Sequence, residues 1–258
     1  MLTSTHFLSA TVLAALLAGA SAPAFAAPVK NIVLVHGAWV DGSGWKPVYD
    51  ILVRDGYTVS IVQEPLTSLE ADVTATKRIL DMQNGPAILV AHSYGGSIIT
   101  EAGVHPNVVG LVYVAAHAPD VGENEAALGK GKPSYTSQQA GAIRRTNDNY
   151  LYLDPAVFYS DFAADLPRDE AEFASRSQVP TAADVFSTSM TVAAWKTKPS
   201  WGIVAGADKI INPDLERWYY ARAKSHTTEI AGASHSVYES RPREVAKVIE
   251  EAAHDAVR

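Results

Sequence analysis

The stretch "ILVAHSYGGSII", residues Ile88–Ile99, places a single serine, Ser93, between an apolar run and two glycines. The apolar run predicts a buried strand, and the small and apolar residues after it have the spacing of a helix. Ser93 either caps that helix or is presented as a nucleophile by a tight turn of the pattern G-x-S-x-G. Ala91 stands in place of the first glycine of that pattern and Gly95 is the second.

Apolar runs typical of strands alternate with amphipathic stretches on both sides of this turn. The expected strands are Asn31–His36, Tyr57–Gln63, Ala87–His92, Val108–Ala116, Ser200–Asp208 and Thr227–Gly232. Stretches with helical spacing separate them, and a closing helix is expected within Ser240–Ala256. This order predicts an α/β fold, with a mostly parallel sheet flanked by helices on both faces.

The alternation stops in the middle of the chain. Residues 120–198 are polar, carry several Tyr and Phe, and contain helix-like pieces such as Leu166–Gln178 but no strong strand. They predict a helical cap inserted over one edge of the sheet. The 258 residues, 47% of them hydrophobic, fit one domain over residues 27–258.

The N-terminal segment resembles a secretory leader. An apolar stretch, Phe7–Ala20, is too short to span a bilayer comfortably, and the small residues Ala24 and Ala26 follow it. We expect a signal peptide over residues 1–26, cleaved after Ala26, and a periplasmic or secreted protein. No Lys or Arg precedes the apolar stretch, so an uncleaved N-terminal anchor is the alternative.

The composition argues against several kinds of partner. The formal net charge is -7 and the basic residues are scattered, which disfavours binding to nucleic acid or to an anionic membrane surface. The chain has no cysteine, so it has no disulfide, no thiol nucleophile and no thiolate metal site. Oligomeric state is left open by the sequence.

Two further residues follow late strands in positions where they could assist Ser93. In parallel α/β sheets, functional groups gather at the carboxyl ends of the strands. Asp208 follows one expected strand and His235 follows the next, so the chain order is serine, acid, histidine. A histidine can activate a serine hydroxyl, and an acid can orient and stabilise that histidine. Asp120, which follows an earlier strand, is the alternative acid.

An oxyanion formed by attack of Ser93 needs two hydrogen-bond donors, which are usually backbone N–H groups. We expect one from Tyr94 and the other from Ala38 in the glycine-containing loop Val35–Trp45, with Trp39 as the alternative donor. Trp39 and Trp195 are also candidate substrate contacts.

Other residues near the expected site have structural interpretations. His36 and His92 both end strands, but no third ligand with suitable spacing accompanies them, so structural roles are favoured over a metal site. The aromatic residues of the insertion could line a pocket, although core packing is favoured for most of them: Tyr150, Tyr152, Phe158, Tyr159 and Phe162.

The motifs "HGAW", "AHSYGG", "GADKIINP" and "GASHSVYESRP" together resemble the α/β-hydrolase superfamily, over the chain from about Val29 onward. The chain is most similar to the small esterase branch, which includes plant methyl-ester esterases and hydroxynitrile lyases. That resemblance implies a catalytic triad of Ser93, Asp208 and His235, an acyl-enzyme intermediate and no cofactor.

Two departures from neighbouring branches narrow the expected reaction. Dehalogenases and epoxide hydrolases of this superfamily use an aspartate where this chain has Ser93, and hydroxynitrile lyases carry a lysine where it has Ser236. We therefore expect hydrolysis of a small or medium carboxylic ester. The alternatives are a lactonase of the acyl-homoserine lactone type, a cofactor-free lyase or haloperoxidase-like activity, and a weakly catalytic ligand-binding protein on the same scaffold.

Overall fold

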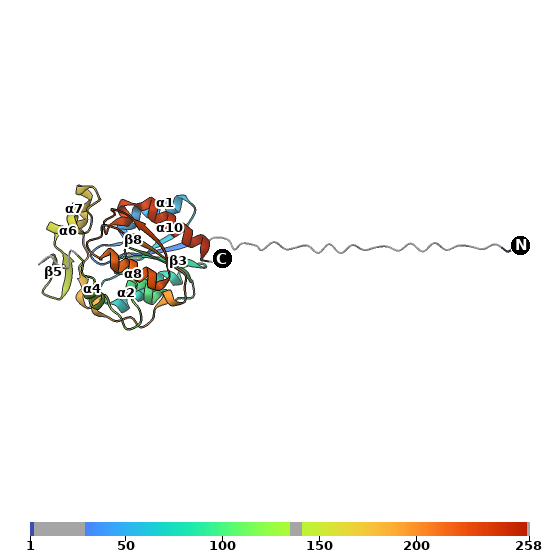
Figure 1. Ribbon diagram of the computed structural model, residues 1–258, viewed down its shortest axis with the longest axis horizontal. Coiled ribbons are helices and arrows are strands. Elements are labelled where there is room, and N and C mark those ends of the chain that lie inside the picture. Colours follow the sequence, from blue (N-terminus) through green and yellow to red (C-terminus); the bar gives the residue numbers. More distant parts are fainter. Residues whose placement is uncertain (3–28, 135–140, 257–258) are drawn as a thin grey trace.

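The computed structural model describes residues 1–2, 29–134 and 141–256, and its centre is a six-stranded parallel sheet (Figure 1). The strand order is β2-β1-β3-β4-β8-β9, and every neighbouring pair is parallel. The strands are β1 (Asn31–Val35), β2 (Thr58–Ile61), β3 (Ala87–His92), β4 (Val108–Val114), β8 (Ser200–Ala205) and β9 (His226–Ile230).

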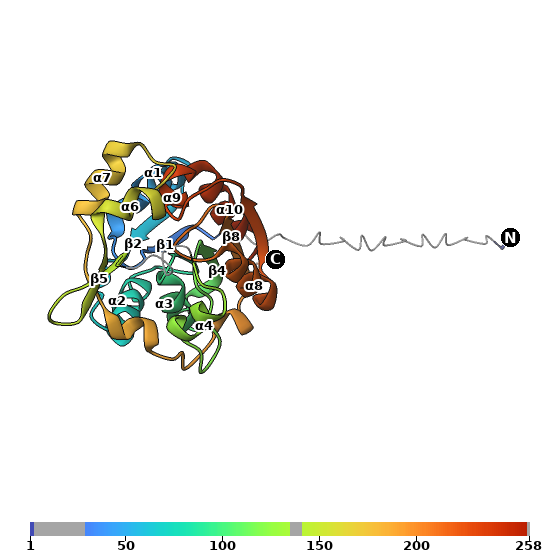
Figure 2. The same cartoon turned by 60° about the vertical axis from the view of Figure 1, so that its left-hand side comes forward.

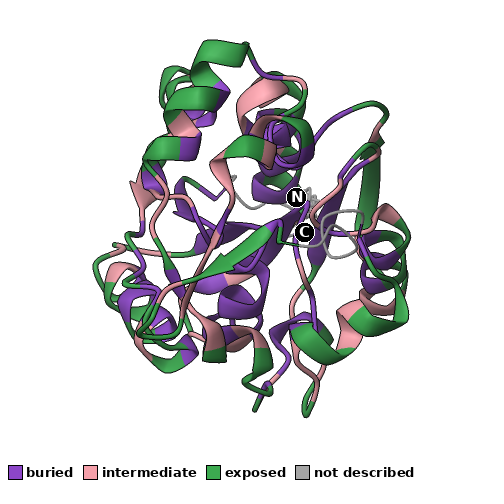
Figure 3. Ribbon diagram, turned by 90° about the vertical axis from the view of Figure 1, so that its left-hand side faces the viewer, coloured by how far each residue is buried: buried purple, intermediate pink, exposed green. Residues whose placement is uncertain are grey.

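Helices cover both faces of this sheet (Figure 2). On one face lie α1 (Lys46–Arg54), α9 (Val237–Ser240) and α10 (Pro242–Asp255), and on the other lie α2 (Leu69–Asp81), α3 (Gly95–Ala102) and α8 (Pro213–Ala223). Alternate strand residues belong to the two cores, with Ile32 in one and Val33 in the other. Such two-sided burial explains why the central strands are continuous apolar runs (Figure 3).

The predicted α/β architecture is therefore confirmed, and the strand limits differ from expectation by a few residues. The largest difference is at the run Ser200–Asp208, where the strand ends at Ala205. Beyond Ala205 the backbone leaves the sheet in a turn, in which the Asp208 amide donates to the Ala205 carbonyl at 3.1 Å. The acid predicted from this strand consequently lies in the loop above it.

The insertion contains strands as well as helices, which the sequence analysis did not anticipate. Its sheet, β5 (Ile143–Arg145), β6 (Tyr150–Leu153) and β7 (Thr181–Ala182), is antiparallel. Its helical elements are α4 (Glu125–Gly131), α6 (Pro155–Asp161), α7 (Arg168–Arg176) and the 3-10 turns η2 (Ala183–Ser187) and η3 (Ala194–Lys196). The three strands are only two to four residues long, and β5 is exposed along its whole length, so they show no apolar alternation.

Strand β7 attaches the insertion to the main sheet. The Ala182 amide donates to the Leu66 carbonyl at 2.9 Å, and the Trp39 amide donates to Thr181 Oγ1 at 3.2 Å. Leu66 and Trp39 lie in the loops after β2 and β1, so the insertion is fixed at the carboxyl edge of the sheet.

The expected leader, residues 1–26, lies almost entirely outside the described residues. Among the helices of the described part, none is both long and apolar enough to cross a bilayer.

Candidate active site

Ser93 lies at a sharp turn between β3 and α3 and has a φ of 55°. Residues other than glycine rarely adopt this left-handed conformation, and those that do are often found in functional turns. The turn is closely packed, because a Cβ on Gly37 would lie 2.7 Å from Ser93 Cβ and one on Gly95 would lie 2.6 Å from the His36 carbonyl oxygen. Tyr94, not Ser93, is the N-cap of α3, so the helix-capping interpretation of Ser93 is not what the structure shows.

Ser93, His235 and Asp208 form a continuous hydrogen-bonded chain. The Ser93 hydroxyl lies 2.8 Å from His235 Nε2, and His235 Nδ1–H donates to Asp208 Oδ2 at 2.6 Å. The backbone amides of Ile210 and Ile211 donate to Asp208 Oδ1 at 2.7 and 3.0 Å. Three N–H donors therefore stabilise the carboxylate, and the carboxylate sets which His235 nitrogen accepts from Ser93.

The His235 ring contacts two other rings, those of Phe162 and His92. Phe162 of the insertion contacts it edge to face, with ring centroids 4.7 Å apart. His92 also contacts the ring, with centroids 4.5 Å apart, and donates from Nε2 to the His235 carbonyl at 2.9 Å. Burial, together with the charge of His235, keeps the pKa of His92 well below its ordinary value, so His92 stays uncharged. His92 thus has a structural role at the site.

A second buried acid, Glu216 on α8, lies behind Asp208. Its Oε2 accepts from the Ala205 amide at 3.0 Å, while Oε1 has no hydrogen-bond donor among the described residues. Burial and the neighbouring Asp208 carboxylate raise the pKa of Glu216 well above its ordinary value. Because Glu216 holds its proton, no second negative charge forms beside the Asp208 carboxylate.

The alternative acid, Asp120, does not contact His235. Its carboxylate forms an ion pair with Lys196 Nζ at 2.5 Å. Although partial burial acts in the opposite direction, the bond to Lys196 lowers the pKa of Asp120. The structure therefore brings Asp208, and not Asp120, to the serine and the histidine.

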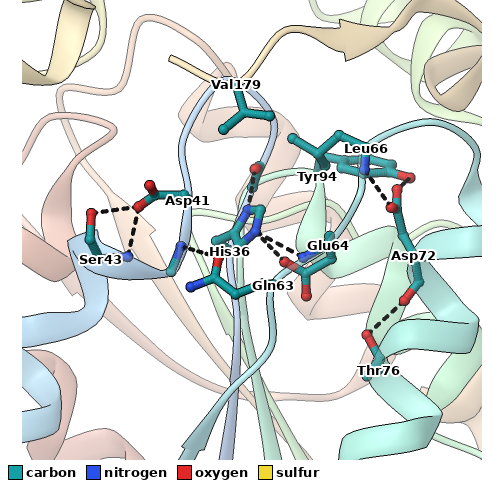
Figure 4. A network of polar contacts seen from close by, with 12 residues as sticks. His36, Asp41, Ser43, Gln63, Glu64, Leu66, Asp72, Thr76, Tyr94 and Val179 are labelled. Carbon is teal, nitrogen blue, oxygen red and sulfur yellow. Dashed lines mark hydrogen bonds and ion pairs between the residues drawn. The ribbon is translucent and has the colours of Figure 1, made fainter. Parts of the chain in front are cut away.

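Two backbone amides beside Ser93 are free to bind an oxyanion. Within the part of the chain that is described, the amides of Ala38 and Tyr94 donate to no acceptor, and both residues border the cavity at Ser93. The Trp39 amide is occupied by Thr181 Oγ1, so the alternative donor is not available. Figure 4 shows how Tyr94 is anchored: its hydroxyl donates to Asp72 Oδ2 on α2 at 2.7 Å.

A cavity of about 580 Å³ opens at Ser93. Its apolar walls come from the loop after β1, from the insertion, from the loop before α8 and from α8 itself: Ala38, Trp39, Ile143, Leu151, Phe186, Ile210, Ile211 and Leu215. Trp39, a candidate substrate contact, therefore lines the cavity. Trp195 is not part of the lining, because its Nε1–H donates to the Pro119 carbonyl at 2.9 Å and its ring packs against Arg222.

Phe186 is the insertion aromatic named in the cavity wall, whereas the five insertion aromatics singled out from the sequence do not line the cavity. Phe158 and Phe162 are fully buried and stacked on each other at 4.7 Å. Tyr150, Tyr152 and Tyr159 are half-buried and are absent from the described lining of the cavity at Ser93.

His36 is also structural. Its Nδ1–H donates to the Gly37 carbonyl at 2.9 Å, and its Nε2 lies 2.6 Å from the buried carboxyl of Glu64 (Figure 4). These contacts hold the loop that carries Ala38. Among the described residues, no group of three His, Cys, Asp or Glu side chains is arranged to hold a metal ion.

A second acid and histidine pair, which was not predicted from the sequence, lies in the cavity wall. His117 follows β4, and its Nε2 lies 3.4 Å from Oε2 of Glu125 on α4. Both residues line the cavity with Ser93. The rule that selected Asp208 and His235, a polar residue just after a strand, also applies to His117. Glu125 had no comparable signal, because it lies in the insertion.

This fold and site define a family. The model of the alpha/beta hydrolase family matches residues 32–248 of the chain. The match covers most of the sequence, and the chain belongs to the alpha/beta hydrolase family. The expectation of an enzyme of the hydrolase class is confirmed at this level.

Particular relatives fall within the esterase branch. The chain is 34% identical over 127 residues to a carbendazim hydrolyzing esterase of Nocardioides sp. (strain SG-4G), a match that covers 43% of this chain and 52% of the relative. The matched part thus spans about half the length of that relative. The expected resemblance to small esterases is confirmed.

Solved structures show the same fold at lower sequence identity. A polyneuridine aldehyde esterase is similar with a TM-score of 0.73 and 16% identity, covering 86% of this chain and 98% of that one. A methylesterase from Arabidopsis is similar with a TM-score of 0.70 and 17% identity, covering 87% and 98%.

Proposed function

We propose that this chain is a serine esterase that cleaves small or medium carboxylic esters through an acyl-enzyme intermediate. The observation that carries this proposal is the hydrogen-bonded chain from Ser93 through His235 to Asp208, beside two free amides and an apolar cavity. The relatives support the substrate class, because those named above are called esterases.

In the acylation step, Ser93 Oγ attacks the ester carbonyl carbon while His235 Nε2 accepts the hydroxyl proton. The carbonyl oxygen becomes an oxyanion and binds the amides of Ala38 and Tyr94. The buried carboxylate of Asp208 stabilises the His235 cation. His235 then donates its proton to the departing alcohol, which leaves an acyl group on Ser93.

In the deacylation step, water attacks the acyl carbonyl while His235 again accepts a proton. The oxyanion forms at the same two amides, and its collapse releases the carboxylic acid and restores the Ser93 hydroxyl. Every proton transfer uses the same nitrogen, His235 Nε2, because Asp208 occupies Nδ1.

The cavity supports an ester of moderate size. Its volume of about 580 Å³ lies within the range of pockets that enclose small organic ligands. Its apolar walls, including Phe186 and Leu215, favour uncharged acyl or alcohol groups.

The test is the rate of hydrolysis of a 4-nitrophenyl ester series, from acetate to octanoate, by the mature protein and by Ser93→Ala. We expect the variant to lose about 10³- to 10⁶-fold in kcat, since triad members act as a unit. The chain-length optimum measures the usable pocket. Equal, near-background rates in both proteins would contradict the proposal and favour a ligand-binding role on the same scaffold.

We also propose that the protein is exported, on the evidence of its leader sequence. Expression with the native N-terminus should yield a periplasmic or secreted chain that begins at Ala27. An intact N-terminus in the membrane fraction would instead support the anchor.

A further inference from the structure

We propose that His117 and Glu125 form a substrate-binding subsite for an uncharged oxygen, such as a hydroxyl, ether or carbonyl oxygen, carried by the ester that Ser93 attacks. The inference rests on the proposed ester hydrolysis and names a chemical feature of its substrate. It starts from two polar residues that the triad does not use, the buried Glu125 and the partly buried His117.

The pair lies beside the nucleophile. The backbone amide of His117 donates to the Ser93 carbonyl at 3.2 Å, so the loop after β4 is fixed directly against the nucleophile turn. Glu125 reaches the same place from the first turn of α4, in the insertion. Both side chains line the cavity that contains Ser93, so a substrate bound at Ser93 passes along this wall.

The hydrogen bonds of the pair are incomplete. Glu125 Oε1 lies 2.5 Å from the Ser97 hydroxyl, and His117 Nδ1 lies 3.2 Å from the Tyr219 hydroxyl. The remaining atoms, His117 Nε2 and Glu125 Oε2, are separated by 3.4 Å, which is longer than a normal hydrogen bond. A loosely paired donor and acceptor at a cavity wall can bond to a ligand at small cost, because little has to be broken.

Both members of the pair are uncharged near neutral pH. Burial raises the pKa of Glu125 to about 8. Burial, assisted by the charge of His235, lowers the pKa of His117 to about 3. Glu125 is thus a carboxylic acid that can donate, and the pair presents no net charge to a ligand.

The surroundings of Glu125 explain why it stays protonated. The groups that face Glu125 carry no positive charge: the Ser97 hydroxyl comes from α3, and uncharged His117 comes from the loop after β4. Two tyrosines, Tyr94 and Tyr219 of α8, are also close, because an ionised Glu125 would raise the pKa of each. Two cations line the cavity near Glu125, Lys130 on the same helix and Arg145, and among the described residues neither forms an ion pair with it. Element η2 packs on α4, and its ionisable residue is the acid Asp184.

These contacts select the ligand chemistry. An acyl chain made only of carbon would leave the loosely held pair without a partner, whereas a neutral oxygen would accept from it. A cation would find no opposing charge at the pair. The subsite therefore favours oxygen-bearing, uncharged esters over hydrocarbon esters of the same shape.

The experiment compares 4-nitrophenyl hexanoate with three near-isosteric esters in which an ether oxygen replaces carbon 3, 4 or 5. The kcat/KM ratio of each oxygen-containing ester to hexanoate is measured at pH 6.5 and pH 9. The proteins are wild type, Glu125→Gln, Glu125→Leu and a control on the same helix, Lys130→Met. Ratios between proteins cancel the intrinsic reactivity of each ester.

We expect at least one ratio to be about 3- to 10-fold higher in wild type than in Glu125→Leu, as one hydrogen bond would give. That excess should fall at pH 9, where Glu125 loses its proton. Glu125→Gln keeps an uncharged donor, so it should retain the excess at both pH values. Lys130→Met should behave like wild type, with an excess at pH 6.5 that falls at pH 9.

Ser93-dependent hydrolysis of hexanoate with equal ratios in wild type and Glu125→Leu would overturn the subsite alone. Absence of any Ser93-dependent hydrolysis would overturn the proposed esterase and the subsite together. Should Glu125→Leu fail to fold, the comparison of wild type with Glu125→Gln at the two pH values decides, because a purely structural role of Glu125 would not make selectivity depend on pH.

Discussion

Two acid and histidine pairs lie near Ser93. One is bonded to the serine at the carboxyl edge of the main sheet, and the other lines the cavity that opens at Ser93, where the insertion meets the sheet. In the first, Asp208 accepts a 2.6 Å hydrogen bond from His235 and two more hydrogen bonds from backbone amides. In the second, Glu125 lies 3.4 Å from His117 and is also bonded to a hydroxyl. The two pairs, each of one acid and one histidine, thus lie in very different environments.

The difference teaches that the donors around a buried acid decide its charge. Three N–H groups stabilise the Asp208 carboxylate, so its histidine can become a cation during a reaction. Glu125 has too few donors to offset burial, and the pKa of the acid rises to about 8. The first pair is suited to moving protons, and the second to binding a neutral group.

The largest expected difference in kcat is between the variants that remove each histidine in turn. We expect His235→Ala to lower kcat for a 4-nitrophenyl ester by about 10⁶-fold, because Ser93 then has no base. His117→Ala should cost about tenfold or less, the scale of one hydrogen bond. Stopped-flow or steady-state rates with both purified variants test this, and equal losses would show that the two pairs share the chemistry.

A smaller effect should follow from the acid behind Asp208. Glu216→Leu leaves the buried Ala205 amide, at the start of the turn that carries Asp208, without its acceptor. We therefore expect kcat to fall about 10- to 100-fold with little change in KM, as for an unpaired buried donor. Glu216→Gln keeps an uncharged acceptor for the Ala205 amide and should remain near wild type with an unchanged pH profile. A leucine variant that folds and is fully active would contradict a positioning role of Glu216.

The smallest effect concerns stability. Folded Glu125 keeps its proton up to a pKa of about 8, whereas the unfolded chain releases it near the ordinary value of 4.5, so this residue lowers the free energy of unfolding as pH rises between those values. Glu125→Gln lacks this contribution. Its melting temperature relative to wild type should therefore rise by about 2–5 °C per pH unit from pH 5 to pH 8. A difference that is constant with pH would show that Glu125 is ionised in the folded protein.

Much of the sheet edge could be predicted from sequence, because its signals are local. The run before Ser93 is apolar on both faces of the strand, and such a run followed by small residues is enough to predict a strand, a turn and a helix. Asp208 and His235 were found because each follows a strand in a parallel sheet, where all carboxyl ends meet.

The insertion could not be predicted as well, since its elements are stabilised by contacts distant in sequence. Strand β7 has two residues and is held by Leu66 and Trp39 from other loops. Trp195 was expected at the substrate, but a bond to the Pro119 carbonyl turns its ring elsewhere.

The sequence by itself determined the parallel α/β fold and placed Ser93, His235 and two candidate acids, Asp208 and Asp120, after strands. Strand periodicity and strand ends are local features of the chain, which is why the sequence was sufficient for them. Only the tertiary structure decided which acid joins His235, which amides stay free and that Glu125 meets His117. Those outcomes depend on burial and on donors contributed by distant segments, and no local pattern records either quantity.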